Sequence, residues 1–240
     1  MIQRFLSVGD AERLGRASEK LGRHDTSPWA LSGGLAIEIH RLRRGCRPSI
    51  RALNDLDFVA DSFACIPGTL VDDFLFRHVH PAGPPGKLML QFVDPQNALR
   101  VDVFRASGTT LNRTARVDLP WGPNQVVSLE DLTARAARIV LDLAEGVPVP
   151  SKHADDYLRL AELADPSIME TAWQDHRKPM HPTTFAEALR LIRELIPARS
   201  HLLINPEYSK DTRQRCSRCA PTAAFPLAEA SVVLSVLGYC

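Results

Sequence analysis

The 240-residue sequence lacks a long hydrophobic run and a marked excess of either charge. No apolar stretch reaches the roughly 18 residues that a membrane-spanning helix needs, and residues 1–16 lack the apolar segment of a secretory signal. We therefore expect a cytoplasmic protein with no membrane partner. The formal net charge of +1 argues against an overall electrostatic attraction to nucleic acid, so an anionic ligand must be bound by a local basic patch.

The sequence also lacks the even set of cysteines that a disulfide framework requires. Five cysteines in a chain without a signal are expected to be thiols or metal ligands. Cys216, Cys219 and Cys240, with His201 as a fourth ligand, could supply one Zn²⁺ site in the tail. The alternative is that these thiols stay reduced and unliganded.

Repeats and low-complexity tracts are absent as well, and a content of 45% hydrophobic and 24% charged residues is that of a folded globular protein. Apolar residues at helical spacing predict helices over 8–22, 35–44, 69–79 and 128–143, and in "HADDYLRLAEL" and "TFAEALRLIREL". The stretch "DPSIMETAWQDHRKPMHPT" between the last two is expected to be a loop or a short, bent helix.

Short apolar runs predict strands over 29–31 and 56–60, and "KLMLQFVD" and "LRVDVFRA" predict a β-hairpin. The expected fold class is α+β, a mixed sheet with flanking helices followed by a helical C-terminal region. We expect three segments: a catalytic core over 1–125, a helical region over 126–200 that closes over a nucleotide, and a cysteine-containing tail over 201–240.

Two acids interrupt the apolar strand in "RALNDLDFVA". Residues two apart in a strand share a face, so Asp55 and Asp57 project together, while Leu56 and Phe58 face the core. Neighbouring anions repel each other unless a cation neutralises them, and carboxylate oxygens suit Mg²⁺. The alternative is that Asp55 only caps the entrance of the strand.

A third acid, Asp102, interrupts the apolar run "LRVDVF". If this hairpin strand lies beside strand 56–60, the three carboxylates converge and can bind two metal ions, or one metal ion beside a general base. The alternative is an acid on an edge strand that faces solvent.

A turn formed by Ser32, Gly33 and Gly34 separates the first strand from the next helix. Two glycines let backbone N–H groups approach a phosphate closely, and the helix N-terminus adds a favourable potential. Alone, such a turn is weak evidence of a phosphate-binding site. The evidence is stronger here because an acid pair and a third acid follow the turn.

This order of motifs resembles the nucleotidyltransferase fold of the DNA polymerase β superfamily, with its Gly-Gly turn, Asp-x-Asp strand and third Asp. It is most similar to the abortive-infection toxins of type IV toxin–antitoxin systems, through "GGLA" at 33–36 and "RALNDLDF" at 51–58. The sequence departs from that branch in a longer connection, "RLRRGCR", and in Leu53, where the branch commonly has Ser.

The resemblance implies an enzyme that moves an NMP from an NTP to an acceptor hydroxyl on a tRNA, a protein or a small molecule, with a cognate antitoxin as a possible partner. It implies that Asp55 and Asp57 bind Mg²⁺ and that Asp102 binds a second metal ion and activates the acceptor. The implied nucleotide-binding residues are Ser32, Gly33, Gly34, Arg51 and Lys152. The alternative function is a non-catalytic binding module of the same fold with a zinc-stapled tail.

Two further residue types are expected to have no catalytic role. The histidines show no metal-ligand spacing and are expected on loops or helix surfaces, at positions 78, 80, 153, 176 and 181. Trp29, Trp121 and Trp173 are expected to pack in the core or at a hinge rather than to stack on nucleic-acid bases.

Overall fold

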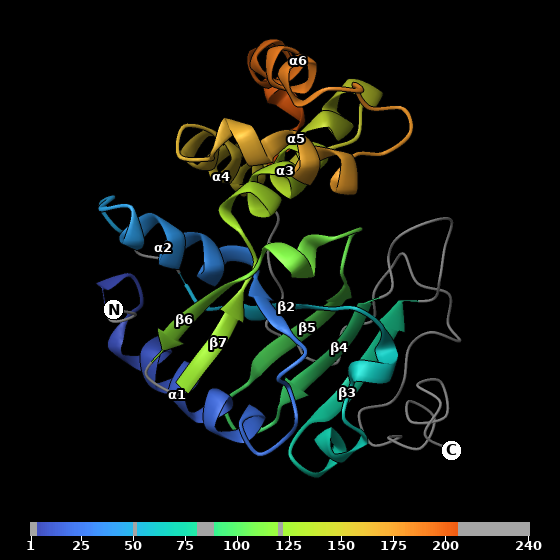
Figure 1. Ribbon diagram of the computed structural model, residues 1–240. Helices are drawn as coiled ribbons and strands as arrows, with labels where there is room; N and C mark the ends of the chain where they lie inside the picture. Colours follow the sequence, from blue (N-terminus) through green and yellow to red (C-terminus); the bar gives the residue numbers. More distant parts are fainter. Residues whose placement is uncertain (1–3, 50–51, 81–88, 120–121, 206–240) are drawn as a thin grey trace. The chain divides into compact units, whose positions relative to one another are not determined.

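The computed structural model describes residues 4–49, 52–80, 89–119 and 122–205, which form two compact units. The sheet unit contains residues 4–106 and 114–126, and the helical unit contains residues 107–113 and 127–205. Figure 1 labels most of their helices and strands. Among the residues described, none of the helices combines the length and the hydrophobicity that crossing a membrane demands.

The sheet unit is built on one seven-stranded sheet with the order β3-β4-β5-β2-β1-β7-β6. Its strands are β1 (Ala30–Ser32), β2 (Asp55–Ala60), β3 (Leu75–His80), β4 (Met89–Asp94), β5 (Leu99–Arg105), β6 (Ala115–Leu119) and β7 (Gly122–Val126). The sheet is mixed: β2 runs parallel to β5 and β1 parallel to β7, whereas the other neighbours are antiparallel. The predicted hairpin is confirmed as β4 and β5.

Helix α1 (Val8–Leu21) packs against this sheet because one side of it is apolar. Leu14, Ala17 and Leu21 are buried, and the Ser7 hydroxyl accepts a hydrogen bond from the backbone N–H of the first turn. Lys20 Nζ also lies 2.7 Å from a carboxylate oxygen of Asp94 in β4. This buried ion pair fixes the helix to the hairpin.

The helix predicted over 69–79 is wrong. A 3₁₀ turn, Gly68–Asp72, precedes strand β3 instead. Leu70 and Phe74 are buried as their spacing predicts, but Phe76 pairs with Phe92 of β4 in an antiparallel register. Pairing with a neighbouring strand has overridden the local spacing. Strands β6 and β7 were not predicted, because their short segments lack a long alternating pattern.

The helical unit contains helices α3 (Leu129–Val140), α4 (Ser151–Ala161), α5 (Pro166–His176) and α6 (Phe185–Ala198), and a small pair of parallel strands, β8 (Val149–Pro150) and β9 (Leu203–Ile204). Ser128 caps α3 as predicted, and Thr184 and Glu187 form a capping box at α6. Residues 165–183, for which a loop and a short, bent helix were both left open, contain helix α5. Trp173 and Tyr157 lie in the core of the unit.

The expected fold class, an α+β mixed sheet with flanking helices followed by a helical region, is therefore confirmed. Helix α2 (Gly33–Arg43) starts directly after β1 and contacts both β1 and β2. That connection places the glycine turn next to the acid-bearing strand.

Candidate active site

Four polar side chains form a row across four neighbouring strands of the sheet. Ser32 of β1 is paired with Asp57 of β2, and Asp57 is paired in turn with Asp102 of β5. Asp102 is also paired with Gln91 of β4. Residues paired across neighbouring strands project from the same face of a sheet. The hairpin strand β5 therefore lies beside β2, which is the condition that the sequence set for convergence of the acids, and Asp57 and Asp102 come together.

Asp55 shares this face because it lies two residues before Asp57 in β2. Its register partner is Arg100, which lies two residues before Asp102 in β5. The residues between them face the opposite way and are buried, with Leu56 only 1% exposed. We call Asp55, Asp57 and Asp102 the carboxylate cluster.

Within the part of the chain that the structure describes, Arg100 is placed against the carboxylate cluster. Its Nη2 donates a hydrogen bond to Asp55 Oδ2, and its Nε lies 3.2 Å from Asp102 Oδ2. That second contact is an ion pair without a hydrogen bond, since the buried Nε has no hydrogen-bond partner. Burial acts to lower the pKa of Arg100, but the charges of the carboxylate cluster outweigh it and raise that pKa. Sequence reasoning missed Arg100, although its spacing of two from Asp102 was a usable signal.

Asp102 is the most enclosed of the three acids, at 5% exposure. Gln91 Nε2 donates a 2.7 Å hydrogen bond to its Oδ1. Burial is the main cause that raises the pKa of Asp102 to about 7, and the charges of Asp57 and Asp55 add to it, while Arg100 and Gln91 act in the opposite direction. The carboxyl group of Asp102 therefore gains and loses a proton near neutral pH.

The glycine turn lies directly against Asp57. Gly33 has a φ of +64°, a conformation that L side chains rarely adopt. A Cβ atom at this position would lie 1.8 Å from Asp57 Oδ2. No side chain fits there, so the backbone at the start of α2 can approach whatever the Asp57 carboxylate binds. Ser32, which is 2% exposed, occupies the N-cap position of the same helix.

The residues of the carboxylate cluster fit a divalent metal ion. Three carboxylates and the Arg100 guanidinium carry a net charge of about −2 when all are ionised, which one Mg²⁺ would balance. The raised pKa of Asp102 shows the same imbalance, because a buried acid short of positive charge retains its proton. Carboxylate oxygens are the ligands that Mg²⁺ prefers.

The remaining predicted site residues lie in the helical unit or outside the described residues. Lys152 is exposed in the first turn of α4, in the helical unit. Arg51 lies outside the described residues, as do the zinc candidates Cys216, Cys219 and Cys240. His201, the fourth zinc candidate, is exposed. The roles of these residues stay predictions.

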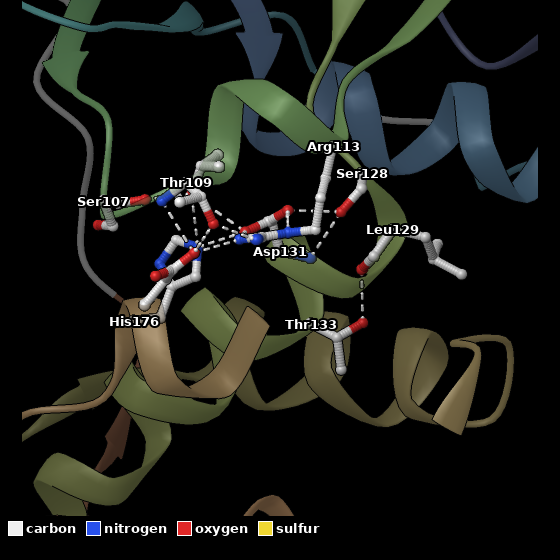
Figure 2. Close-up of polar contacts among 10 residues, drawn as sticks. Ser107, Thr109, Arg113, Ser128, Leu129, Asp131, Thr133 and His176 are labelled. Atoms are coloured by element: carbon white, nitrogen blue, oxygen red, sulfur yellow. Dashed lines mark hydrogen bonds and ion pairs between the residues drawn. The ribbon is translucent and has the colours of Figure 1, made fainter. Parts of the chain in front are cut away.

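Another buried carboxylate, Asp131, was not predicted, and Figure 2 shows its surroundings in the helical unit. Asp131 Oδ2 accepts hydrogen bonds from Ser128 Oγ at 2.6 Å and Arg113 Nε at 2.9 Å. Its Oδ1 accepts from Thr110 Oγ1 at 3.0 Å and Arg113 Nη2 at 2.6 Å, and lies 3.0 Å from His176 Nε2. We call these five residues the Asp131 cluster. Burial acts to raise the pKa of Asp131, but the hydrogen bonds outweigh it and hold that pKa well below its usual range.

The expectation that the histidines lie on loops or helix surfaces is wrong for His78 and His80, which belong to strand β3, and for His176, which is buried in α5. His181 lies in a loop as expected, but it is buried. His176 and His181 are both 7% exposed. Burial lowers the pKa of His176, against the opposing charge of Asp131. The expectation for the tryptophans is confirmed for Trp29 and Trp173, which are buried, while Trp121 lies outside the described residues.

Comparison with known proteins gives limited similarity. No protein-family model matches the chain, and no curated protein matches its sequence. The antibiotic-resistance factor ANT(2'')-Ia, solved in solution, is 14% identical, with 80% of this chain and 98% of that chain covered and a TM-score of 0.46. An antigenic nucleotidyltransferase-like protein from Paracoccidioides brasiliensis is 14% identical, with 84% and 96% covered and a TM-score of 0.41.

JHP933 from Helicobacter pylori is 13% identical, with 81% of this chain and 94% of that chain covered and a TM-score of 0.31. At these identities and TM-scores, the likeness carries no conclusion about what this chain does.

Proposed function

We propose that the protein is a metal-dependent nucleotidyltransferase, which moves an NMP from an NTP to an acceptor hydroxyl. The observation that carries the proposal is the register of the sheet, which sets Asp57 and Asp102 opposite each other on neighbouring parallel strands, with the glycine turn against Asp57. Acids from separate segments, meeting beside a helix N-terminus, are suited to binding a metal ion and a phosphate together.

In this proposal Asp55, Asp57 and Asp102 hold Mg²⁺. When bound, the metal ion neutralises charge on the phosphates and helps to align the attacking and leaving oxygens. The backbone N–H groups of Gly33 and Gly34, at the start of α2, donate hydrogen bonds to the triphosphate. Ser32 adds its hydroxyl at the same turn.

Asp102 has a second role as the proton acceptor. A general base works best when its pKa is near the operating pH, and the pKa of Asp102 is about 7. The oxygen of the acceptor hydroxyl forms a bond to the α-phosphorus, and its proton passes to Asp102. The bond from the α-phosphorus to the oxygen that bridges to the β-phosphorus breaks, and pyrophosphate leaves with that electron pair.

We also propose, from the sequence resemblance, that Lys152 and Arg51 contact the phosphates. The acceptor is a hydroxyl of a tRNA, a protein or a small molecule. If the protein is a toxin component with a cognate antitoxin, its expression alone arrests growth, and Asp57→Ala removes the arrest.

The test is to incubate the full chain with each α-labelled NTP, Mg²⁺ and a cell extract, and to ask which fraction carries label. Asp57→Ala should reduce labelling to background, while Asp61→Ala should label as well as the wild type. Asp61 is the matched control, an exposed acid directly after β2. Labelling that survives in Asp57→Ala would overturn the proposal. Mg²⁺-dependent NTP binding with no labelled product would favour the alternative, a non-catalytic binding module.

A further inference from the structure

Arg100 of β5 contacts two of the three proposed metal ligands, which come from different strands. Its Nη2 donates a hydrogen bond to Asp55 Oδ2, and its Nε lies 3.2 Å from Asp102 Oδ2. The other oxygen of Asp102 accepts a 2.7 Å hydrogen bond from Gln91 Nε2. Each oxygen of Asp102 therefore faces a donor group, and Arg100 lies beside the oxygen that Gln91 leaves for a metal ion or a proton.

The contact between Arg100 and Asp102 is weaker than the contacts that an arginine can make with a carboxylate. In the Asp131 cluster, Arg113 donates from Nε to one oxygen of Asp131 at 2.9 Å and from Nη2 to the other at 2.6 Å. Arg100 Nε, in contrast, is buried and has no hydrogen-bond partner among the described residues. Charge alone holds Arg100 against Asp102, so leaving that acid breaks no hydrogen bond.

The Arg100 side chain is also the more accessible of the two arginines. Its side chain is 26% exposed, whereas that of Arg113 is 14% exposed. A long side chain with access to solvent can change rotamer without moving its strand. Arg100 is therefore suited to exchanging one anionic partner for another, whereas Arg113 is fixed.

The glycine turn lies at the same edge of the sheet as Arg100. Strand β1 runs antiparallel to β2 and ends at Ser32, so the turn that follows it lies at the edge where β2 begins. Asp55 is the first residue of β2 and the register partner of Arg100. Only β2 separates β1 from β5, which corresponds to roughly 10 Å between those strands. A phosphate bound at the turn on the side of β2 would lie within reach of an arginine side chain on β5.

We infer that Arg100 is an exchangeable counter-ion of the active site, which pairs with the acids in the metal-free protein and with the phosphates of the NTP in the loaded one. When Mg²⁺ binds, Arg100 leaves Asp102, whose Oδ2 is then open to the metal ion and to the proton of the acceptor. The freed guanidinium donates hydrogen bonds to phosphate oxygens. The inference rests on the proposed function, because it assigns the order of events at the same site.

Charge gives the reason for this exchange. Mg²⁺ and a guanidinium repel each other when they share one carboxylate oxygen. The phosphates of an NTP bring new negative charge to the same edge of the sheet, and a planar guanidinium can bind two phosphate oxygens at once. Arg100 thus keeps an anionic partner both before and after the metal ion binds.

The test measures metal and phosphate binding by the full chain, without turnover. The variant is Arg100→Met, which keeps an unbranched side chain but removes its charge, and the matched control is Arg105→Met, at an exposed arginine of the same strand. Calorimetry gives the affinity for Mg²⁺ alone. It also gives the affinity for tripolyphosphate, the phosphate chain of an NTP without its nucleoside, in saturating Mg²⁺. A buffer at pH 9 keeps the carboxylates ionised in every variant.

In EDTA, Arg100→Met should melt about 2–5 °C lower than the wild type, because the acids lose their counter-ion. Saturating Mg²⁺ should remove this difference, since the metal ion then takes the place of the arginine. The variant should bind Mg²⁺ about tenfold more tightly than the wild type and tripolyphosphate about tenfold more weakly. Arg105→Met should match the wild type in all three measurements.

An affinity for Mg²⁺ that is unchanged or lower in Arg100→Met would overturn the inference, because Arg100 would then hold the acids in place for the metal ion. Tighter Mg²⁺ binding with unchanged tripolyphosphate affinity would overturn the contact with the phosphates. If Arg100→Met does not fold, Arg100→Gln, which keeps an N–H donor for Asp55, is measured in its place with the same expectations.

The labelling assay separates this inference from the proposed function. If the wild type labels an acceptor but the Arg100 variant binds Mg²⁺ no more tightly, the counter-ion exchange fails and nucleotidyl transfer stands. If the variant gains Mg²⁺ affinity but the wild type labels no fraction, nucleotidyl transfer fails and the exchange at the metal site stands. A wild type that binds neither Mg²⁺ nor tripolyphosphate overturns both.

Discussion

Asp102 and Asp131 are two buried aspartates of one chain whose pKa values shift in opposite directions. Asp102 is 5% exposed and Asp131 fully buried, and each has an arginine beside it. The pKa of Asp102 is raised to about 7, whereas that of Asp131 lies well below its usual range. Burial acts to raise both, so the difference comes from the neighbours.

The neighbours differ in sign and number. At Asp102, the alternation of side chains along β2 and the strand register bring two further acids, Asp55 and Asp57, and, among the described residues, the cation that contacts Asp102 is Arg100. At Asp131, four side chains donate or present N–H and O–H groups, and a position in the first turn of α3 adds the helix dipole (Figure 2). Asp102 has two acids and one arginine as charged neighbours and is suited to binding a cation, whereas Asp131 is fully hydrogen-bonded and is suited to a structural role.

The largest expected effect is that of Asp131→Asn on stability. It removes the charge that Arg113 and His176 face, and we expect the free energy of unfolding to fall by about 3–5 kcal/mol. Urea unfolding followed by tryptophan fluorescence measures it, since Trp173 lies in the core of the same unit. Because the folded-state pKa of Asp131 is lowered, its stabilisation exists above the unfolded value near 3.8 and is lost as the pH falls below it.

The control for Asp131→Asn is Asp155→Asn, at an exposed position of α4. This substitution should change stability by no more than about 0.5 kcal/mol. Equal stability of the two variants would mean that the Asp131 cluster does not stabilise the helical unit.

The two aspartates also differ in how much of their setting was visible in the sequence. Convergence of Asp102 with Asp55 and Asp57 was predicted, conditional on hairpin strand β5 lying beside β2, because alternation shows which residues share a face. Gln91 was not identified, since its contact with Asp102 depends on the register of β4. Ser128 is the local partner of Asp131 and was predicted only as a helix cap, whereas Arg113, Thr110 and His176 are separated from Asp131 by 18 to 45 residues and nothing local marked them.

The long amphipathic helices and the strands β1, β2, β4 and β5 were predicted well, whereas β3, β6 and β7 were not. Ser128 and the apolar spacing that follows it predicted α3 with its cap. The stretch around Leu70 and Phe74 satisfied helical spacing yet forms a turn and a strand, because β4 provides pairing partners that no local pattern encodes.

Asp102→Asn should have the opposite effect on stability to Asp131→Asn. Because the folded-state pKa of Asp102 is raised, the protonated carboxyl contributes stability. That contribution is fully present below the unfolded pKa near 3.8 and is lost as the pH rises through about 7, where Asp102 ionises in the folded protein. Asn does not ionise, so in metal-free buffer at pH 8 we expect the variant to be more stable by about 1–3 kcal/mol. Thermal unfolding from pH 5 to pH 8 measures this gain, which should grow with pH.

The same variant should lose nucleotidyl transfer by about a hundredfold or more, since it cannot accept a proton. If Asp102→Asn is instead destabilised at every pH, the Asp102 carboxyl stabilises the fold as that of Asp131 does.

A smaller effect is expected in the pH dependence of Mg²⁺ binding. A proton and Mg²⁺ compete for Asp102, so the apparent affinity for Mg²⁺ should fall by up to about tenfold for each pH unit below about 7. Calorimetric titration with Mg²⁺ between pH 5.5 and pH 8.5 measures it. An affinity that does not change over this range would mean that Asp102 is not a ligand, while Asp61→Asn should reproduce the wild-type curve.

The smallest effect, and the finest test of the contrast, is that of Gln91→Leu. Gln91 stabilises the charged form of Asp102 through its 2.7 Å hydrogen bond and thereby lowers the pKa of that carboxyl. Leucine keeps the volume within the sheet but donates nothing, and a net hydrogen bond of about 1 kcal/mol corresponds to less than one pH unit. The pH at the midpoint of the Mg²⁺-affinity curve should therefore rise by about half a pH unit.

Gln96→Leu, at an exposed glutamine of the β4–β5 turn, should leave that midpoint unchanged. If Gln91→Leu weakens Mg²⁺ binding equally at all pH values, Gln91 contributes only packing. The proton affinity of Asp102 would then be set by burial and by the other two acids alone. A shifted midpoint instead shows that Gln91 stabilises the charged form of Asp102, as several donors do for Asp131. One such donor is too few to keep Asp102 ionised without a metal ion.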